Sequence, residues 1–175
     1  MMWELFEHYG IVYKVNKGNF IVPSKFPPIP SDINMNTAPQ WDGDSSYVGR
    51  SYLFTRMNNF CFCKLVSALH LFVTEVAVQT KKSLHLTHVY QNMLELEVHS
   101  RGTKKTKLLG VCRISYDYEY NRVTLFVCED DPSNSFFCLM AEELELIFSS
   151  EDVFIRPESS VELVCLLSDT SIYHY

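Results

Sequence analysis

Two apolar patterns of helical period, separated by segments of strand period, constrain the fold of this chain more than any other feature. The first begins after Asn58 and Asn59, which are typical N-cap residues. Its apolar positions are Phe62, Leu65, Val66, Leu69, Phe72, Val73 and Val76. We expect Asp131 and Pro132 to start the second, because proline is favoured in the first turn of a helix. Its apolar positions are Phe136, Phe137, Met140, Leu144, Ile147 and Phe148. Each pattern predicts a helix with one buried face.

Strand patterns lie before, between and after the two predicted helices. Leu94, Leu96 and Val98 alternate with polar residues, as in a half-buried strand. The turn signal Asn121 separates two further apolar runs. The expected strands are 47–57, 94–98, 108–115, 123–128 and 161–166, and 84–90 is also β-prone. Helices separated by antiparallel hairpins predict an α+β domain over residues 47–167, followed by a tail over 168–175.

The first 26 residues predict a short helix followed by a β-hairpin. The helix is expected to end at Gly10, and the hairpin strands flank a turn at Asn16, Lys17 and Gly18. A helix plus a β-hairpin is the closing half of a winged-helix unit. Residues 1–26 are too few to bury a core alone, so we expect them to be the C-terminal part of such a unit.

Residues 27–46 predict a proline-rich connector. They hold four of the seven prolines, and proline disfavours both helix and central strand. We expect an ordered strap across the surface, anchored by Ile33 and Trp41, which also marks a domain boundary.

The charge balance excludes several classes of protein. The 175 residues carry 21 acidic and 15 basic side chains, a net charge of −6, which disfavours nucleic-acid binding. No apolar run reaches the ~18 residues of a membrane span. The N-terminus has no signal-peptide pattern, so we expect a cytoplasmic protein.

Six cysteines are best interpreted as reduced thiols, since five lie in apolar runs. These five are Cys63, Cys112, Cys128, Cys138 and Cys165. Cys61 and Cys63 are too closely spaced for a zinc knuckle, and no second pair follows, so we predict no metal site.

Catalytic motifs are absent from the sequence, which has no phosphate loop, dinucleotide fingerprint or nucleophile elbow. His85 and His88 are expected on opposite faces of a strand, as surface residues. One enzymatic alternative stays open: a small cytosolic cysteine-dependent hydrolase or transferase that pairs Cys61, Cys63 or Cys165 with a histidine.

Two charged clusters are notable. Glu142, Glu143 and Glu145 are expected to form the solvated face of the second helix. A basic hairpin tip could meet an acidic partner, but a soluble turn is the favoured interpretation because the cluster is short. Its residues are Arg101, Lys104, Lys105 and Lys107.

Several stretches resemble the COR module of Roco proteins. The stretch from Met2 to Tyr13, followed by Phe20 to Ser24, is similar to the end of the COR-A subdomain. Tyr47 to Tyr52 and then Phe60 to Leu65 resemble the strand and helix start that open COR-B. Residues 136–148 and 161–165 are similar to the late helix and closing strand of COR-B.

This resemblance implies a function that does not depend on catalysis. Roco proteins join a Ras-like (Roc) G domain to the COR module, which transmits the nucleotide state and contributes to dimerisation. The chain would then be a homodimeric regulatory module that couples a Roc G domain in cis to a partner subunit or effector kinase domain. It would bind no cofactor itself, with GTP or GDP and Mg²⁺ on the adjacent G domain. Arg50 and Tyr52 would face that G domain, although Tyr52 also fits a core position. A winged-helix nucleic-acid adaptor is a further alternative.

Overall fold

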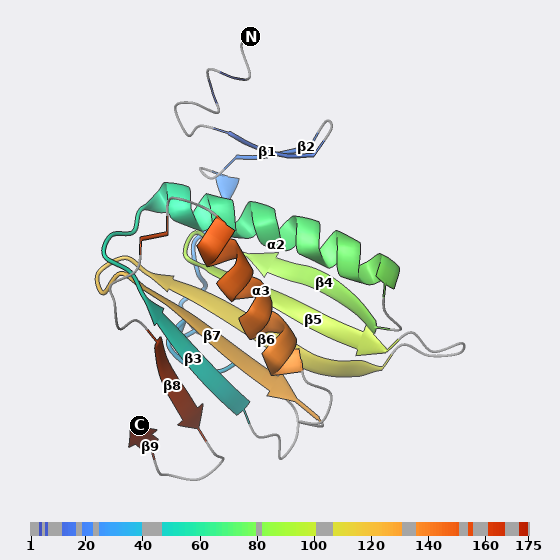
Figure 1. Cartoon of the computed structure of the whole chain (residues 1–175), viewed down its shortest axis with the longest axis vertical. Coiled ribbons are helices and arrows are strands. Elements are labelled where there is room, and N and C mark those ends of the chain that lie inside the picture. The colour runs from blue at the N-terminus through green and yellow to red at the C-terminus, as the bar shows by residue number, and fades with distance from the viewer. Residues whose placement is uncertain are drawn as a thin grey trace.

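The fold is α+β, with two helices packed on one face of a seven-stranded antiparallel sheet (Figure 1). The computed structural model describes residues 4, 6, 12–16, 19–22, 25–39, 47–79, 82–100, 107–130, 136–150, 154–155, 161–166 and 172–174. The predicted fold class is therefore confirmed.

The strands of the sheet follow the order β4-β5-β6-β7-β3-β8-β9. Their bounds are β3 Tyr47–Leu53, β4 Lys82–Val89, β5 Met93–Ser100, β6 Leu108–Asp117, β7 Arg122–Glu129, β8 Val161–Leu166 and β9 Ile172–His174. All five expected strands are present, and β9 forms within the segment that was predicted as a tail. The strand β3 ends at Leu53, earlier than expected, and the amide of Phe54 donates to the carbonyl of Asn121, just before β7.

Both predicted helices are present. Helix α2 spans Asn59–Gln79, and the side-chain oxygen of Asn58 accepts a hydrogen bond from the amide of Cys61 at 3.1 Å, which confirms the predicted N-cap. Helix α3 spans Phe136–Ser150. The predicted start of that helix at Asp131 and Pro132 lies outside the described residues. The amide of Phe136 donates to the carboxylate of Glu129 at 3.2 Å.

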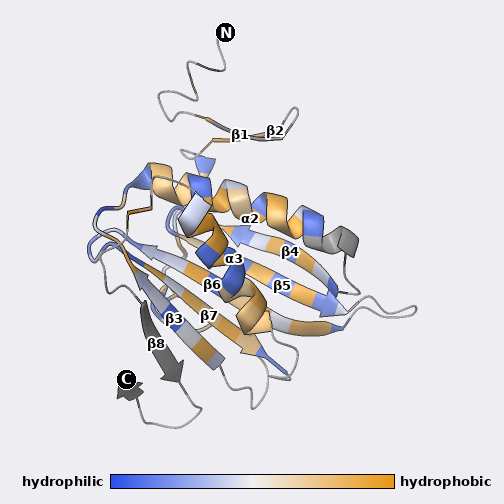
Figure 2. Cartoon of the chain, viewed as in Figure 1, coloured by the Kyte–Doolittle hydropathy of each residue, from blue (hydrophilic) through white to orange (hydrophobic). Residues whose placement is uncertain are grey.

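The core lies between the two helices and the sheet. Figure 2 shows apolar residues concentrated on the helices and along the central strands. An aromatic cluster anchors α3: the ring of Phe148 lies 5.1 Å from Tyr52 and 4.9 Å from Phe54. At the start of α2, the hydroxyl of Tyr116 donates to the carbonyl of Asn58 at 2.7 Å. None of the helices described here is long and apolar enough to cross a membrane.

The other face of the sheet is crossed by residues 25–39, drawn in pale blue behind the strands in Figure 1. The carbonyl of Pro27 accepts from the amide of Gln91 at 3.0 Å, and the carbonyl of Pro39 accepts from the thiol of Cys128 at 3.5 Å. Between these ends, Arg113 donates to strap carbonyls. Residues 25–39 thus form an ordered strap, as expected. Ile33 is half-buried within it, and the second expected anchor, Trp41, lies outside the described residues.

The predicted N-terminal hairpin is present as β1 Tyr13–Asn16 and β2 Asn19–Ile21, which pair antiparallel. Of the predicted helix before it, only Glu4 and Phe6 are described.

The prediction for Cys138 is wrong, because this residue is exposed on α3 rather than buried. It lies two residues after the buried Phe136 and two before the buried Met140. Two residues correspond to about 200° of helical rotation, so Cys138 points away from the core. Cys61, Cys63, Cys112 and Cys128 are buried free thiols.

Candidate functional site

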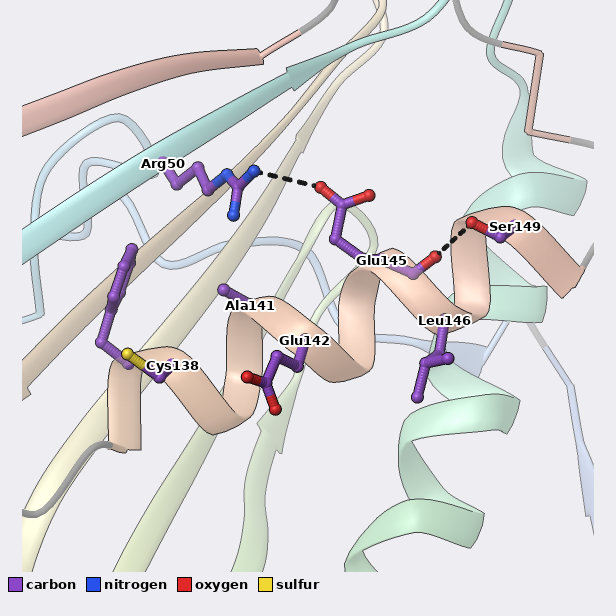
Figure 3. Close-up of a pocket in the computed structure, with 8 residues that line it drawn as sticks. Arg50, Cys138, Ala141, Glu142, Glu145, Leu146 and Ser149 are labelled. Atoms are coloured by element: carbon purple, nitrogen blue, oxygen red, sulfur yellow. Dashed lines mark hydrogen bonds and ion pairs between the residues drawn. The ribbon is translucent and has the colours of Figure 1, made fainter.

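A hollow of about 520 Å³ lies along the outer side of α3, next to β3 (Figure 3). Its lining residues come from β3 and α3: Arg50, Phe137, Cys138, Ala141, Glu142, Glu145, Leu146 and Ser149. Cys138, Glu142, Glu145 and Ser149 follow one another at helical spacing, so they share the side of α3 opposite its core face. Leu146 is 65% exposed, which adds an apolar contact surface to this side.

Arg50 extends from β3 toward α3 along one side of the hollow. Its guanidinium lies 3.2 Å from a carboxylate oxygen of Glu145 (Figure 3). It also lies 5.2 Å from the ring centre of Tyr52. The Nε atom of Arg50 is buried and has no hydrogen-bond partner among the described residues. Both charged side chains remain about 30% exposed, and an ion pair of this exposure contributes roughly 0 to 1 kcal/mol. The pair is therefore accessible for exchange with charges of a binding partner.

The two residues expected to face a G domain, Arg50 and Tyr52, differ in how deeply they are buried. Arg50 reaches the surface of the hollow, whereas Tyr52 is fully buried and packs against Phe148. Tyr52 therefore occupies a core position, which is the alternative that the sequence left open. A G-domain contact at Arg50 stays a prediction.

The predicted basic tip lies mostly outside the described residues, which include only Lys107 of its four members. Lys107 is exposed, and its ammonium group lies 2.9 Å from a carboxylate oxygen of Asp130. This lysine therefore has a partner within the chain.

The acidic face of α3 is less solvated than expected at two of its three residues. Glu142 is exposed, but Glu143 and Glu145 are half-buried. Burial, and secondarily the charge of Glu75 on α2, raises the pKa of the Glu143 carboxyl. Residues two apart in a strand share a face, so Arg50 lies on the same face as Tyr52. This alternation was the signal in the sequence that a carboxylate of the helix layer would pair with Arg50.

The thiols proposed as nucleophiles are poorly suited to that role. Burial raises the pKa of Cys63 to about 12, and Cys61 is also buried. The side chain of Cys165 lies outside the described set. Since a thiolate is the reactive species, a buried thiol with a raised pKa is a weak nucleophile at neutral pH.

His85 and His88 are both exposed, as expected, but the prediction of opposite faces is wrong. A β-bulge between Leu86 and His88 shifts the register, so the histidines lie opposite Glu97 and Glu95, which share a face of β5. His85 packs on His99 with ring centres 5.3 Å apart. Within the described part of the chain, no group of three or more histidine, cysteine or acidic residues is arranged to hold a metal ion.

The sequence matches no protein-family model, and it matches none of the curated proteins with which it was compared.

Proposed function

We propose that this chain is a non-catalytic regulatory and dimerisation module, which couples a Ras-like Roc G domain to a partner subunit or effector kinase domain. The resemblance to the COR module supplies the identity of the partners in this proposal. The cytoplasm is the compartment in which such a module would act.

The observation that carries the proposal is the composition of the hollow beside α3. It combines an exposed leucine with a half-buried Arg50–Glu145 ion pair, and it is open on one side along the helix. Protein interfaces typically combine an apolar centre with a polar rim, and arginine is enriched in them. A module that acts through contact needs such a surface, whereas an enzyme needs an activated group.

Charge and thiol burial favour this function over the two alternatives. The cysteine-dependent enzyme requires a reactive thiolate, and the described candidates Cys61 and Cys63 are buried. The nucleic-acid adaptor requires a basic surplus, and the chain has a net charge of −6.

The coding sequence upstream of this chain gives the first test. The proposal expects a G domain whose phosphate loop, GxxxxGK followed by Ser or Thr, lies within about two hundred residues. Titration calorimetry would then measure binding of the chain to that G domain, loaded in turn with GDP and with a GTP analogue. We expect dissociation constants that differ by at least about fivefold between the two states. No upstream G domain, or no binding in either state, would overturn the coupling function.

Variants locate the contact on the chain. We expect Arg50→Glu to weaken G-domain binding by about tenfold or more, because it places a third carboxylate in the hollow. The matched control is Lys107→Glu, which reverses an exposed charge that belongs to a different pair. Equal effects of the two variants would show that net charge, not the hollow, controls binding. Sedimentation over a dilution series measures dimerisation separately, and a monomer at every concentration would remove that part of the proposal.

A further inference from the structure

The strap and the helices cover the two faces of the sheet in chemically different ways. On the helix face the buried side chains form one continuous apolar core. On the strap face, buried polar side chains gather: Ser51, Arg113, Ser115 and Thr124 account for four of the five that the described residues contain. The fifth, Glu129, ends β7 and accepts from the amide of Phe136 at the start of α3. The strap therefore covers a surface that water can also solvate.

Four polar side chains on this face pair within the sheet itself. The hydroxyls of Ser51 and Thr124 lie 3.2 Å apart, on the paired strands β3 and β7. The guanidinium of Arg113 binds the carboxylate of Glu95 at 2.7 Å across β5 and β6. Removal of the strap would therefore leave no charge on this face without its counter-charge. Uncovering this face would therefore expose mainly paired polar groups, together with the apolar side chains of Met93 and Phe126.

The strap itself holds its shape largely through local turns. The amide of Ile33 donates to the carbonyl of Pro30, and the amide of Thr37 donates to the carbonyl of Asn34. Both hydrogen bonds lie within the strap and would survive its departure from the sheet. The strap adds no strand to the sheet among the described residues, and most of its side chains are exposed.

The side chain of Arg113 links the middle of the strap to the sheet through hydrogen bonds. Nη1 of Arg113 donates to the carbonyls of Asn34 at 3.1 Å and Thr37 at 3.0 Å, while the rest of its guanidinium binds Glu95. The planar guanidinium fork allows Arg113 to bind the carboxylate and the strap carbonyls at the same time. Further along, the thiol of Cys128 contacts the carbonyl of Pro39.

We propose that residues 27–39 are a displaceable cover, which leaves the sheet as a unit while the sheet and both helices stay folded, and that Arg113 holds it closed. Opening exposes the polar face of β3, β5, β6 and β7. Opening also lengthens the tether between the β1–β2 hairpin and β3, because the strap joins them in sequence. The two arrangements give the chain a conformational device of the kind that couples one part of a protein to another. This inference stands on the contacts of the strap and does not depend on the proposed function.

Two buried cysteines on neighbouring strands offer a matched test. Cys128 of β7 lies under the end of the strap, and Cys112 of β6 lies in the helix-side core. They are 1% and 0% exposed, so both require an opening event before they can react. The experiment is native-state labelling of the purified chain with N-ethylmaleimide. Mass spectrometry would quantify each cysteine, with rates normalised to those of the urea-unfolded chain. Cys138, which is exposed, reports that the reagent is active.

We expect Cys128 to be labelled at least about tenfold faster than Cys112, because strap opening is more frequent than global unfolding. Arg113→Lys keeps the charge beside Glu95 but removes the fork, so it should raise the Cys128 rate severalfold further and leave Cys112 unchanged. Arg50→Lys, the same change on the helix face, should alter neither rate. Equal normalised rates for Cys128 and Cys112 in the wild-type chain would overturn the proposal. An equal acceleration of both cysteines by Arg113→Lys would overturn it as well.

Hydrogen exchange gives a second readout on the unmodified wild-type chain, which decides the question even if Arg113→Lys does not fold. Amides of Ile33 and Thr37 should exchange faster than those at the centre of β5 and β6. Protection of the strap equal to that of these central strands would contradict a displaceable cover.

Discussion

Arg113 and Glu95 face each other on β6 and β5 and form the least exposed ion pair among the described residues. Their side chains are 7% and 13% exposed, and two guanidinium nitrogens lie 2.7 and 2.8 Å from the same carboxylate oxygen. A buried pair of this kind is costly to break, because removal of one partner leaves an uncompensated charge in a poorly solvated place.

Glu95→Ala should therefore lower the free energy of unfolding by about 3 kcal/mol, as measured by urea denaturation at pH 7. Glu97→Ala is the matched control, since Glu97 is two residues further along the same face of β5 and pairs with His99 in a more exposed position. We expect this control to cost less than about 1 kcal/mol. A loss at Glu95 no larger than that at Glu97 would contradict the prediction.

Glu143 of α3 should destabilise the fold at neutral pH. Burial and the charge of Glu75 raise its pKa above the ordinary value of 4.5, so the folded chain binds the proton more tightly than the unfolded chain does. The resulting stability is present below pH 4.5 and is lost as the pH rises through the folded-state pKa. Glu143→Gln should thus raise the free energy of unfolding at pH 7 by up to about 1 kcal/mol, given the partial exposure of the side chain.

The gain at Glu143→Gln should disappear when the measurement is repeated at pH 4. Glu142→Gln, the adjacent change on the exposed side of α3, should alter stability by less than about 0.5 kcal/mol at either pH. A gain of equal size at both pH values would mean that shape or helix propensity, rather than charge, explains it.

Asn121 is the one described residue other than glycine with a left-handed backbone, at φ 49°. Its side-chain oxygen accepts from the amide of Met57 at 2.9 Å, and its carbonyl accepts from the amide of Phe54. Asn121→Ala should cost about 2 kcal/mol, because it removes the acceptor and retains the strained backbone. Asn121→Gly relieves the backbone and should cost about 1 kcal/mol. Thermal unfolding of the two variants tests this order, and the reverse order would contradict it.

The elements of the fold could be predicted because apolar periodicity is a local property. The period of 3.6 identified the buried faces of α2 and α3, and alternation identified the buried face of β5. The same period places Cys138 on the outside of α3, although its neighbours in sequence are apolar. The insertion of β3 between β7 and β8 could not be predicted, because it depends on pairing between distant segments.

The contact of Arg113 with the strap and the ion pair of Arg50 with Glu145 had weaker signals in the sequence. The strap carbonyls that accept from Arg113 belong to the backbone, so the residue types at positions 34 and 37 do not predict the contact. Glu145 was one of three similar carboxylates, and only the position of α3 over β3 selects it as the partner of Arg50. The β-bulge at Thr87, which reorients His88, likewise follows from pairing with β5.

The buried thiols predict a loss of stability in alkaline solution. Burial raises the pKa of Cys63 to about 12 and that of Cys128 to about 11, from an ordinary value of 9.0. Below pH 9 these thiols are protonated in both the folded and the unfolded chain, so they do not change the free energy of unfolding. Between pH 9 and the folded-state pKa, only the unfolded chain releases the proton, so the free energy of unfolding must fall as the pH rises. Urea denaturation at pH 8, 9, 10 and 11 should show this fall. Cys63→Ala should reduce its slope, whereas Cys138→Ala, which removes an exposed thiol, should retain the wild-type slope. A stability that stays constant from pH 8 to 11 would show that these thiols are solvated in the folded chain.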